Sequence, residues 1–344
     1  MLNGIDDYKY VDIDTPEPKD NEVLVNVKAC GICGSDIPRA YRDGAHNMPL
    51  IIGHEFAGKV VEAGNSVPKE WMNKKVGIFP LIPCKECVAC KQKKYEMCRD
   101  YSYLGSRTNG GFAEYVSVPE WNLIELPDSI SYEEAAMLEP MAVAVHAMRR
   151  AGLKQDDTVV VIGLGTIGML LTMFLMEAGV KNILTVGNKE YQKHKVLTLG
   201  IPEANYCDTK REDVSEWIKS KTDNKGANVV FECVGRCETY EQAVDIAAIS
   251  GTVMLVGNPN SDMELSKNIY WKILRNQLTV LGTWNSSFTH DEDDDWHYVL
   301  NRLADGRVNS KQFISHSFSL ENIVDGFEIM RDKKEDYLKI IANI

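Results

Sequence analysis

The sequence predicts an α/β protein in which a doubly wound parallel sheet is joined to a second, β-rich domain. Residues 150–289 alternate apolar strands with helical segments, which is typical of a parallel sheet covered on both faces. Residues 1–149 carry short strands bounded by Gly and Pro. A chain of 344 residues is also too long for one ordinary core. We assign 150–289 to one domain and 1–149 with 290–344 to the other, because a final strand at 338–341 is expected to rejoin the first part.

The composition restricts the function before any motif is considered. A net charge of −12 disfavours a general nucleic-acid or membrane-surface binder, which needs a cationic face. Residues 1–10 lack the blocks of a signal peptide, and no apolar run reaches transmembrane length. The nine cysteines are odd in number and clustered, which favours metal ligation in a reducing compartment over disulfides. We therefore expect a cytoplasmic protein.

The first domain is organised around residues 30–58. Strands are expected at 22–28, 59–62 and 75–78. Cys33 is followed closely by Ser35, and His54 is followed by Glu55, all among apolar residues. A catalytic zinc site needs N, S and O ligands of this kind and one open position. A plainer interpretation stays open, because a buried Cys is often a small hydrophobe and a His beside a Glu is often a hydrogen-bonded pair.

A lobe at residues 80–100 carries four cysteines in the pattern C-x2-C-x2-C-x7-C. They are Cys84, Cys87, Cys90 and Cys98. Four thiolates on one loop can close a tetrahedron around Zn²⁺ and leave no vacancy for chemistry, so a structural zinc is predicted. The alternatives are a redox CxxC pair and four unrelated thiols.

A helical region begins at Ser131, where Glu134 at the third following position forms a capping box. Apolar residues continue at helical spacing to Met148, interrupted by Pro140. Glu139 stands out there, because a buried carboxylate must be paired or coordinated. An exposed charge at a helix end is the alternative.

The second domain opens with a strand at 158–162, followed by a GxGxxG turn and a helix ending near Gly179. Further strands are expected at 182–186, 228–232, 251–256 and 278–282, the last of them at the sheet edge. In this strand–turn–helix context the motif predicts a Rossmann dinucleotide site, with the pyrophosphate at the helix N-terminus. The expected contacts are Gly163, Gly165, Thr166, Ile167 and Gly168. A tight turn without a ligand is the alternative.

The end of the second strand bears on the choice of cofactor. NAD-specific domains carry an acidic residue there, whereas this chain has Gly187, Asn188 and Lys189. A glycine leaves room for a 2′-phosphate that a lysine can pair with, so NADP is favoured over NAD. A solvated helix face is the alternative explanation of the lysine. Val256 and Thr283, at two further strand ends, complete the candidate cofactor contacts.

Taken in order, these motifs resemble the zinc-dependent medium-chain dehydrogenase/reductase family over essentially the whole chain. The resemblance rests on 33–36, 53–55, the four-cysteine lobe, 138–140 and 163–168. It implies a GroES-like catalytic domain in which Cys33, His54 and Glu139 hold a catalytic zinc. It also implies that Glu55 is a neighbour able to exchange onto the metal and that Ser35 passes the substrate proton outward. Pro38 stands where many members have a relay histidine, so the outer proton path is unassigned.

Residues 44–46, 103–107, 110–115 and 282–284 are similar to the polyol-phosphate branch of this family. That similarity implies oxidation of a secondary alcohol of a galactitol-1-phosphate or arabitol-phosphate type substrate, as a homodimer or homotetramer. The basic residues that would hold the phosphate are Arg39, His46 and Arg107. Unphosphorylated polyol or L-threonine dehydrogenase is the main alternative. A non-enzymatic nucleotide binder and a zinc-independent reductase fit less well, because neither needs the metal-ligand set.

Overall fold

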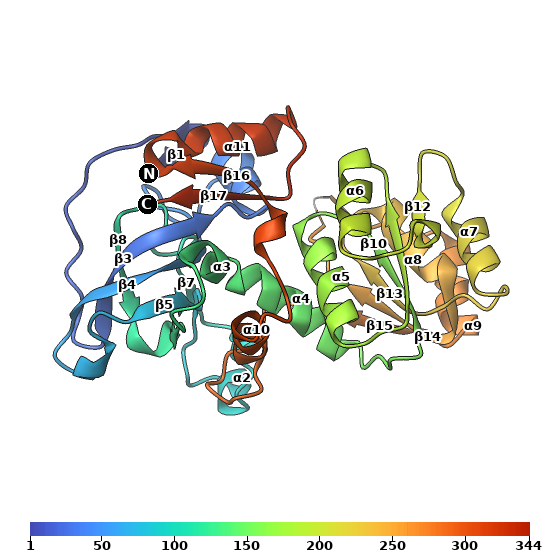
Figure 1. Ribbon diagram of the computed structural model, residues 1–344, viewed down its shortest axis with the longest axis horizontal. Coiled ribbons are helices and arrows are strands. Elements are labelled where there is room, and N and C mark those ends of the chain that lie inside the picture. The colour runs from blue at the N-terminus through green and yellow to red at the C-terminus, as the bar shows by residue number, and fades with distance from the viewer. Residues whose placement is uncertain (260) are drawn as a thin grey trace. The chain divides into compact units, whose positions relative to one another are not determined.

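The computed structural model describes residues 1–259 and 261–344 and divides them into two compact units (Figure 1). Unit 1 contains Met1–Ala142 and Ser286–Ile344, and unit 2 contains Val143–Asn285. The junctions lie a few residues before the predicted ones at 149 and 289. No helix in the described part of the chain is long and apolar enough to cross a membrane.

Unit 1 is built on a seven-stranded, mainly antiparallel sheet in the order β16-β17-β3-β4-β5-β9, with β8 also paired to β3. The strands are β3 (Glu22–Gly31), β4 (Glu55–Ala63), β5 (Lys75–Ile78), β8 (Tyr115–Pro119), β9 (Leu123–Glu125), β16 (Ile314–Ser319) and β17 (Lys339–Asn343). Two small pairs are β1 (Leu2–Gly4) with β2 (Asp7–Tyr8) and β6 (Leu81–Ile82) with β7 (Ser102–Tyr103). The final strand does pair with β3, as the sequence predicts.

The helices of unit 1 are short. They are α1 (Asp36–Pro38), α2 (Val88–Lys91), α3 (Tyr132–Ala136), α4 (Leu138–Arg150, which ends in unit 2), α10 (Asp295–Ala304) and α11 (Ile323–Asp332). The predicted capping box is present, since the Ser131 side chain accepts from the Glu134 N–H and the Glu134 carboxylate accepts from the Ser131 N–H. The helical region breaks at Met137, between α3 and α4, and not at Pro140. Pro140 lies in the first turn of α4, where a proline is tolerated because the N–H that it lacks would have no helical partner.

Unit 2 is a six-stranded parallel sheet in the order β12-β11-β10-β13-β14-β15, flanked by helices (Figure 1). Its strands are β10 (Thr158–Ile162), β11 (Asn182–Gly187), β12 (Tyr206–Asp208), β13 (Ala227–Glu232), β14 (Ala247–Leu255) and β15 (Thr279–Gly282). Its helices are α5 (Thr166–Glu177), α6 (Glu190–Thr198), α7 (Val214–Lys221), α8 (Cys237–Ile246) and α9 (Lys267–Arg275). The prediction of a doubly wound sheet with β15 at its edge is confirmed, and the short strand β12 is the one that the sequence did not suggest.

The chain order explains where a ligand can bind in this sheet. The chain runs outward from β10 through β11 to β12 on one side and then from β13 through β14 to β15 on the other, so the strand order reverses between β10 and β13. Ligands of open α/β sheets bind beyond the carboxyl ends of the strands at such a switch point. The loops after β10 and β13 are therefore the expected borders of a binding crevice within unit 2.

Candidate functional site

The four cysteines of the lobe surround one small space. The Sγ–Sγ separations are 3.5 Å for Cys87–Cys90 and Cys84–Cys98, and 3.9 Å for Cys84–Cys90 and Cys87–Cys98. Four sulfurs about 2.3 Å from a central Zn²⁺ lie about 3.8 Å apart in a tetrahedron. Hydrogen bonds from the backbone N–H groups of Cys90 and Arg99 lower the pKa of Cys87 to about 6, which favours a thiolate. The residues present therefore fit a closed zinc site.

A second potential metal site lies where strand β3 ends beside the start of strand β4. Gly31 pairs with Glu55 across the two strands, so Cys33 and His54, just beyond them, come together. Atoms of Cys33, His54 and Glu55 lie within 4.8 Å of one another. This group has one sulfur, one nitrogen and one carboxylate, which is the donor mixture of an open zinc site.

Buried charge surrounds this second site. Asp36 is fully buried, accepts a hydrogen bond from the Cys33 N–H at 3.0 Å, and lies 3.5 Å from His54 Nδ1. Burial lowers the pKa of His54, but Asp36 and Cys33 raise it, and the net shift is upward. The direction of this shift reflects negative charge around the ring, and the same charge favours a bound cation.

The two glutamates near the site have different partners. Glu55 Oε2 is 2.5 Å from the Nζ of Lys339, a buried lysine on β17, so its charge is already compensated. Glu139 is also buried, and the Tyr103 hydroxyl donates to its Oε1 at 3.3 Å. Burial, with a contribution from the nearby Glu55 charge, raises the pKa of Glu139 to about 7. Among the described residues, a cationic side chain is bonded to Glu55 and none to Glu139, although Glu139 lies outside the close group of Cys33, His54 and Glu55.

In unit 2 the three glycines of the turn have different environments. Gly163 adopts φ = 91°, and a Cβ on Gly168 would lie 1.9 Å from the Gly163 carbonyl oxygen. A Cβ on Gly165 would meet nothing within 4 Å, and Gly165 caps α5 without a side-chain hydrogen bond. The first glycine thus makes the turn, the third packs against it, and the middle one leaves open space at a helix N-terminus. The turn therefore fits a pyrophosphate, with Thr166 and Ile167 in the first turn of α5.

The other predicted cofactor residues follow strand ends on the same edge of the sheet. Gly187 ends β11, Val256 follows β14 and Thr283 follows β15, while Asn188 and Lys189 lead into α6. The Thr283 hydroxyl oxygen is buried and has no hydrogen-bond partner among the described residues. The parallel register therefore brings Gly163, Gly187, Val256 and Thr283 to one edge.

Comparisons with known proteins agree with this geometry. Residues 19–128 match the alcohol dehydrogenase GroES-like domain, and residues 166–305 match the zinc-binding dehydrogenase domain. The chain is 31% identical over 309 residues to galactitol 1-phosphate 5-dehydrogenase of Escherichia coli (strain K12), covering 89% of this chain and 88% of that one. It is 30% identical to D-arabitol-phosphate dehydrogenase of Enterococcus avium, covering 99% and 95%. The chain belongs to the zinc-binding alcohol dehydrogenase family.

A solved structure extends the comparison to the cofactor. A candidate zinc-binding dehydrogenase from Sinorhizobium meliloti 1021, bound to NADP, superposes with a TM-score of 0.91 at 28% identity, covering 100% of this chain and 98% of that one. The chain is thus an oxidoreductase of a family that acts on CH–OH groups with zinc and a nicotinamide cofactor.

In this dehydrogenase the three residues predicted to hold a substrate phosphate lie in different surroundings. Arg39 pairs with the buried carboxylate of Asp36. Arg107 lies over the Tyr101 ring, 4.3 Å from its centroid, and its Nη1 donates to the Tyr101 carbonyl at 3.3 Å. The buried Nε of Arg107 has no partner among the described residues. His46 is exposed.

Sequence reasoning missed three residues of these sites. The sequence could have indicated Asp36, because it follows Ser35 in the same motif. It could also have indicated Lys339, because a lysine is unusual in an apolar strand. It could not have indicated Tyr206, because strand β12 was not predicted. The Ser35 hydroxyl, which the sequence did single out, donates to Cys33 Sγ at 3.4 Å.

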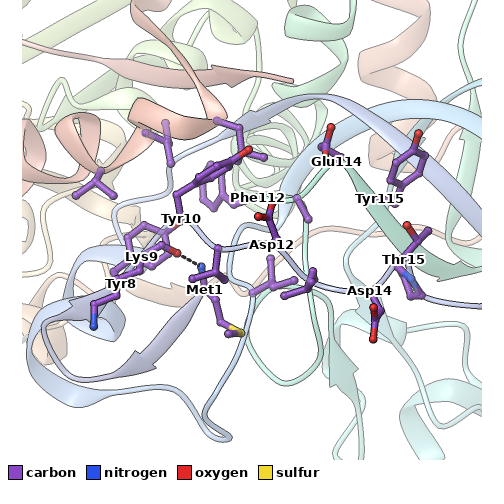
Figure 2. Close-up of a pocket in the computed structure, with 18 residues that line it drawn as sticks. Met1, Tyr8, Lys9, Tyr10, Asp12, Asp14, Thr15, Phe112, Glu114 and Tyr115 are labelled. Atoms are coloured by element: carbon purple, nitrogen blue, oxygen red, sulfur yellow. Dashed lines mark hydrogen bonds between the residues drawn. The ribbon is translucent and has the colours of Figure 1, made fainter.

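A separate pocket in unit 1 lies away from the predicted site residues (Figure 2). It is lined by the N-terminal segment, by residues 112–115 and by the start of α11. Figure 2 shows the Met1 ammonium group donating to the Lys9 carbonyl, at 2.6 Å, beside the rings of Tyr8 and Tyr10. None of the predicted metal, cofactor or substrate residues lines this pocket.

Proposed function

We propose that this dehydrogenase oxidises a secondary alcohol of a polyol phosphate, of the galactitol-1-phosphate or arabitol-phosphate type, to the keto-sugar phosphate. The observation that carries the proposal is the guanidinium of Arg107. One edge donates to a carbonyl while the buried Nε has no partner among the described residues. A buried guanidinium N–H without a partner is costly, and a phosphate is the anion that a guanidinium fork fits best.

The metal-site residues support an alcohol oxidation. Cys33 and His54 with Glu139 are the proposed ligands of the catalytic zinc, and Glu55, compensated by Lys339, is the proposed neighbour. Zinc polarises an alcohol or carbonyl oxygen, and the nicotinamide exchanges hydride with the carbon. The Ser35 hydroxyl, next to Cys33, is the group that we propose carries the substrate proton outward.

The experiment is a kinetic panel of pentitol and hexitol phosphates, the matching free polyols and L-threonine, for wild type and Arg107→Ala. We expect Arg107→Ala to raise KM for the phosphorylated substrate roughly ten- to a hundredfold, because one charge-assisted contact is worth about 1.5–3 kcal/mol. KM for the free polyol should hardly change. Arg42→Ala is the matched control, since Arg42 is an exposed arginine whose guanidinium pairs with Asp43. A wild type that prefers free polyol or threonine would overturn the phosphate proposal.

We also propose that NADP is used at least as well as NAD. A Cβ on Gly187 would lie 3.1 Å from the Tyr206 hydroxyl and 3.2 Å from Leu164 Cδ1. The phenol of Tyr206, on the neighbouring strand β12, therefore lies beside the end of β11, where NAD-specific domains carry a carboxylate. Tyr206 is buried, and burial is the first cause that raises its pKa to about 12, so the hydroxyl stays a donor for a phosphate oxygen.

Gly187→Asp tests this cofactor preference, and Gly187→Ala is its control because it adds the same Cβ without the charge. We expect the aspartate to lower the NADP-to-NAD ratio of kcat/KM by roughly tenfold or more through repulsion of the 2′-phosphate. The alanine should shift both cofactors alike. A wild type that binds NAD tightly and ignores NADP would contradict the proposal.

The assembly is proposed to be a homodimer or a dimer of dimers. β15 is at the edge of its sheet, and unpaired edges tend to be covered. Exposed large side chains of unit 2 include Trp271, Leu274 and Trp284, on α9 and just after β15. Light scattering at micromolar concentration tests this, and a monomer would contradict it.

All nine cysteines are free thiols in the structure, which supports the proposed cytoplasmic location.

A further inference from the structure

The carboxyl end of β13 carries a buried glutamate that the proposed reaction does not use. Glu232 is the last residue of β13 and is only 2% exposed. It is paired in register with Ile162 of β10 on one side and Leu255 of β14 on the other. It therefore lies at the switch point of the sheet, directly beside the strand that leads into the Gly163 turn.

The side chain of Glu232 organises the loop that follows it. Its Oε1 accepts from the N–H groups of Val234 at 2.8 Å and Gly235 at 2.9 Å, and from the Thr239 hydroxyl at 2.8 Å. Its Oε2 also accepts from the Gly235 N–H, at 3.1 Å. The two oxygens of a carboxylate can accept from all these donors. A glutamine, which is neutral and has the same shape, has only one acceptor oxygen.

The backbone of the same residue holds a second loop. The Glu232 carbonyl accepts from the N–H groups of Val256, at 2.8 Å, and Gly257, at 2.9 Å. The two loops touch, since a Cβ on Gly257 would lie 2.2 Å from the Gly235 nitrogen. One residue thus ties together the loops that follow β13 and β14.

These loops reach the turn that is expected to hold the pyrophosphate. A Cβ on Gly163 would lie 2.4 Å from Val234 Cγ2, so Val234 closes directly over the first glycine of the turn. The position of Val234 depends on its N–H bond to Glu232. Any displacement of this loop therefore changes the wall of the crevice at Gly163.

We propose that Glu232 is a positioning residue for the nicotinamide cofactor, which fixes the loops after β13 and β14 against the glycine turn. It touches no cofactor atom and acts through Val234, Gly235 and the Val256–Gly257 turn. The proposal rests on the use of a nicotinamide cofactor and is independent of which alcohol is oxidised.

Glu232→Gln tests the proposal because it keeps the shape of the side chain and replaces one acceptor oxygen with a donor. The dissociation constants of NADPH and NADH, measured by fluorescence titration, should rise about tenfold, the effect of one lost buried hydrogen bond. KM for the cofactor should rise in parallel while kcat stays within about twofold, since the chemistry at the metal is unchanged. The titration needs neither substrate nor turnover, so failure of the polyol-phosphate proposal would leave this result readable.

Thr222→Val is the matched structural control. The Thr222 hydroxyl is buried, donates to the Ile218 carbonyl at 2.8 Å and accepts from the Gly226 N–H at 3.0 Å, just before β13 begins. Loss of the Thr222 hydroxyl should lower Tm without changing cofactor affinity.

If Glu232→Gln lowers Tm and leaves both dissociation constants unchanged, Glu232 is only structural and the proposal is wrong. If Glu232→Gln does not fold, Thr239→Val removes one of the donors to Glu232 and the acceptor of the Arg236 N–H in the same loop, and unchanged affinity in that variant overturns the proposal equally. A wild type that binds neither dinucleotide would overturn both the cofactor assignment and this role.

Discussion

The lobe of four cysteines and the Cys33–His54 site differ in how the chain builds them. The lobe takes all its proposed ligands from residues 84–98 and completes a set of four sulfurs. The proposed Cys33–His54 site draws on the ends of two paired strands, the buried Glu139 of α4 as its proposed third ligand, and a lysine from β17. A site built from one loop can close by itself, whereas a site assembled from distant elements can leave a position open for substrate.

The strongest test of this difference is Cys33→Ser. Loss of a ligand from an open site should lower kcat by roughly a thousandfold or more, since metal polarisation contributes several kcal/mol to the barrier. The fold should remain, because no loop depends on this ion for closure. Steady-state kinetics with circular dichroism and zinc analysis would measure both effects. Cys30→Ala is the control, as Cys30 is a fully buried thiol three residues away in the core. Substantial zinc-dependent turnover in Cys33→Ser would contradict the ligand assignment.

Cys90→Ser should give the opposite result. The structural ion contributes folding energy, so its loss should cost about 3 kcal/mol or more and lower Tm by about 10 °C in a domain of this size. Zinc analysis should fall from about two ions to one while the remaining folded enzyme keeps its kcat. Cys207→Ala, a buried thiol in the core of unit 2, is the control for general thiol loss. Unchanged stability with full activity would show that the lobe holds no structural ion.

The same difference decides what could be predicted from the sequence. The four-cysteine spacing and the GxGxxG turn are local patterns, and the structure brings the four sulfurs together and places the turn directly before α5. The Glu55–Lys339 pair joins residues 284 positions apart, and only the register of β3 with β4 and β17 brings them together. The contact of Gly187 with Tyr206 depends on a three-residue strand, β12, which is too short for a periodic pattern. Long-range pairing and short strands are therefore what the sequence alone did not provide.

The smallest effect is expected at Asp36, which separates ligand orientation from ligation. Asp36 is fully buried, holds the Cys33 N–H and the Arg39 guanidinium, and faces His54 Nδ1. Burial acts to raise the pKa of Asp36, but His54 and Arg39 lower it, and the net shift is downward, so the group is a carboxylate at neutral pH. Partners of this kind orient metal-bound histidines, and their loss typically costs about 10- to 100-fold in metal affinity.

Asp36→Asn keeps the shape of the side chain and removes its charge. We expect chelator competition to show a 10- to 100-fold weaker zinc at the Cys33–His54 site, within the range that second partners of metal-bound histidines usually contribute, and no change at the lobe. Asp43→Asn is the control, because Asp43 is an exposed carboxylate that pairs only with Arg42 among the described residues. Equal zinc affinity in Asp36→Asn and wild type would mean that Asp36 braces Arg39 and its loop without orienting His54. The affinity of the Cys33–His54 site for zinc would then be set by its direct ligands without a contribution from Asp36.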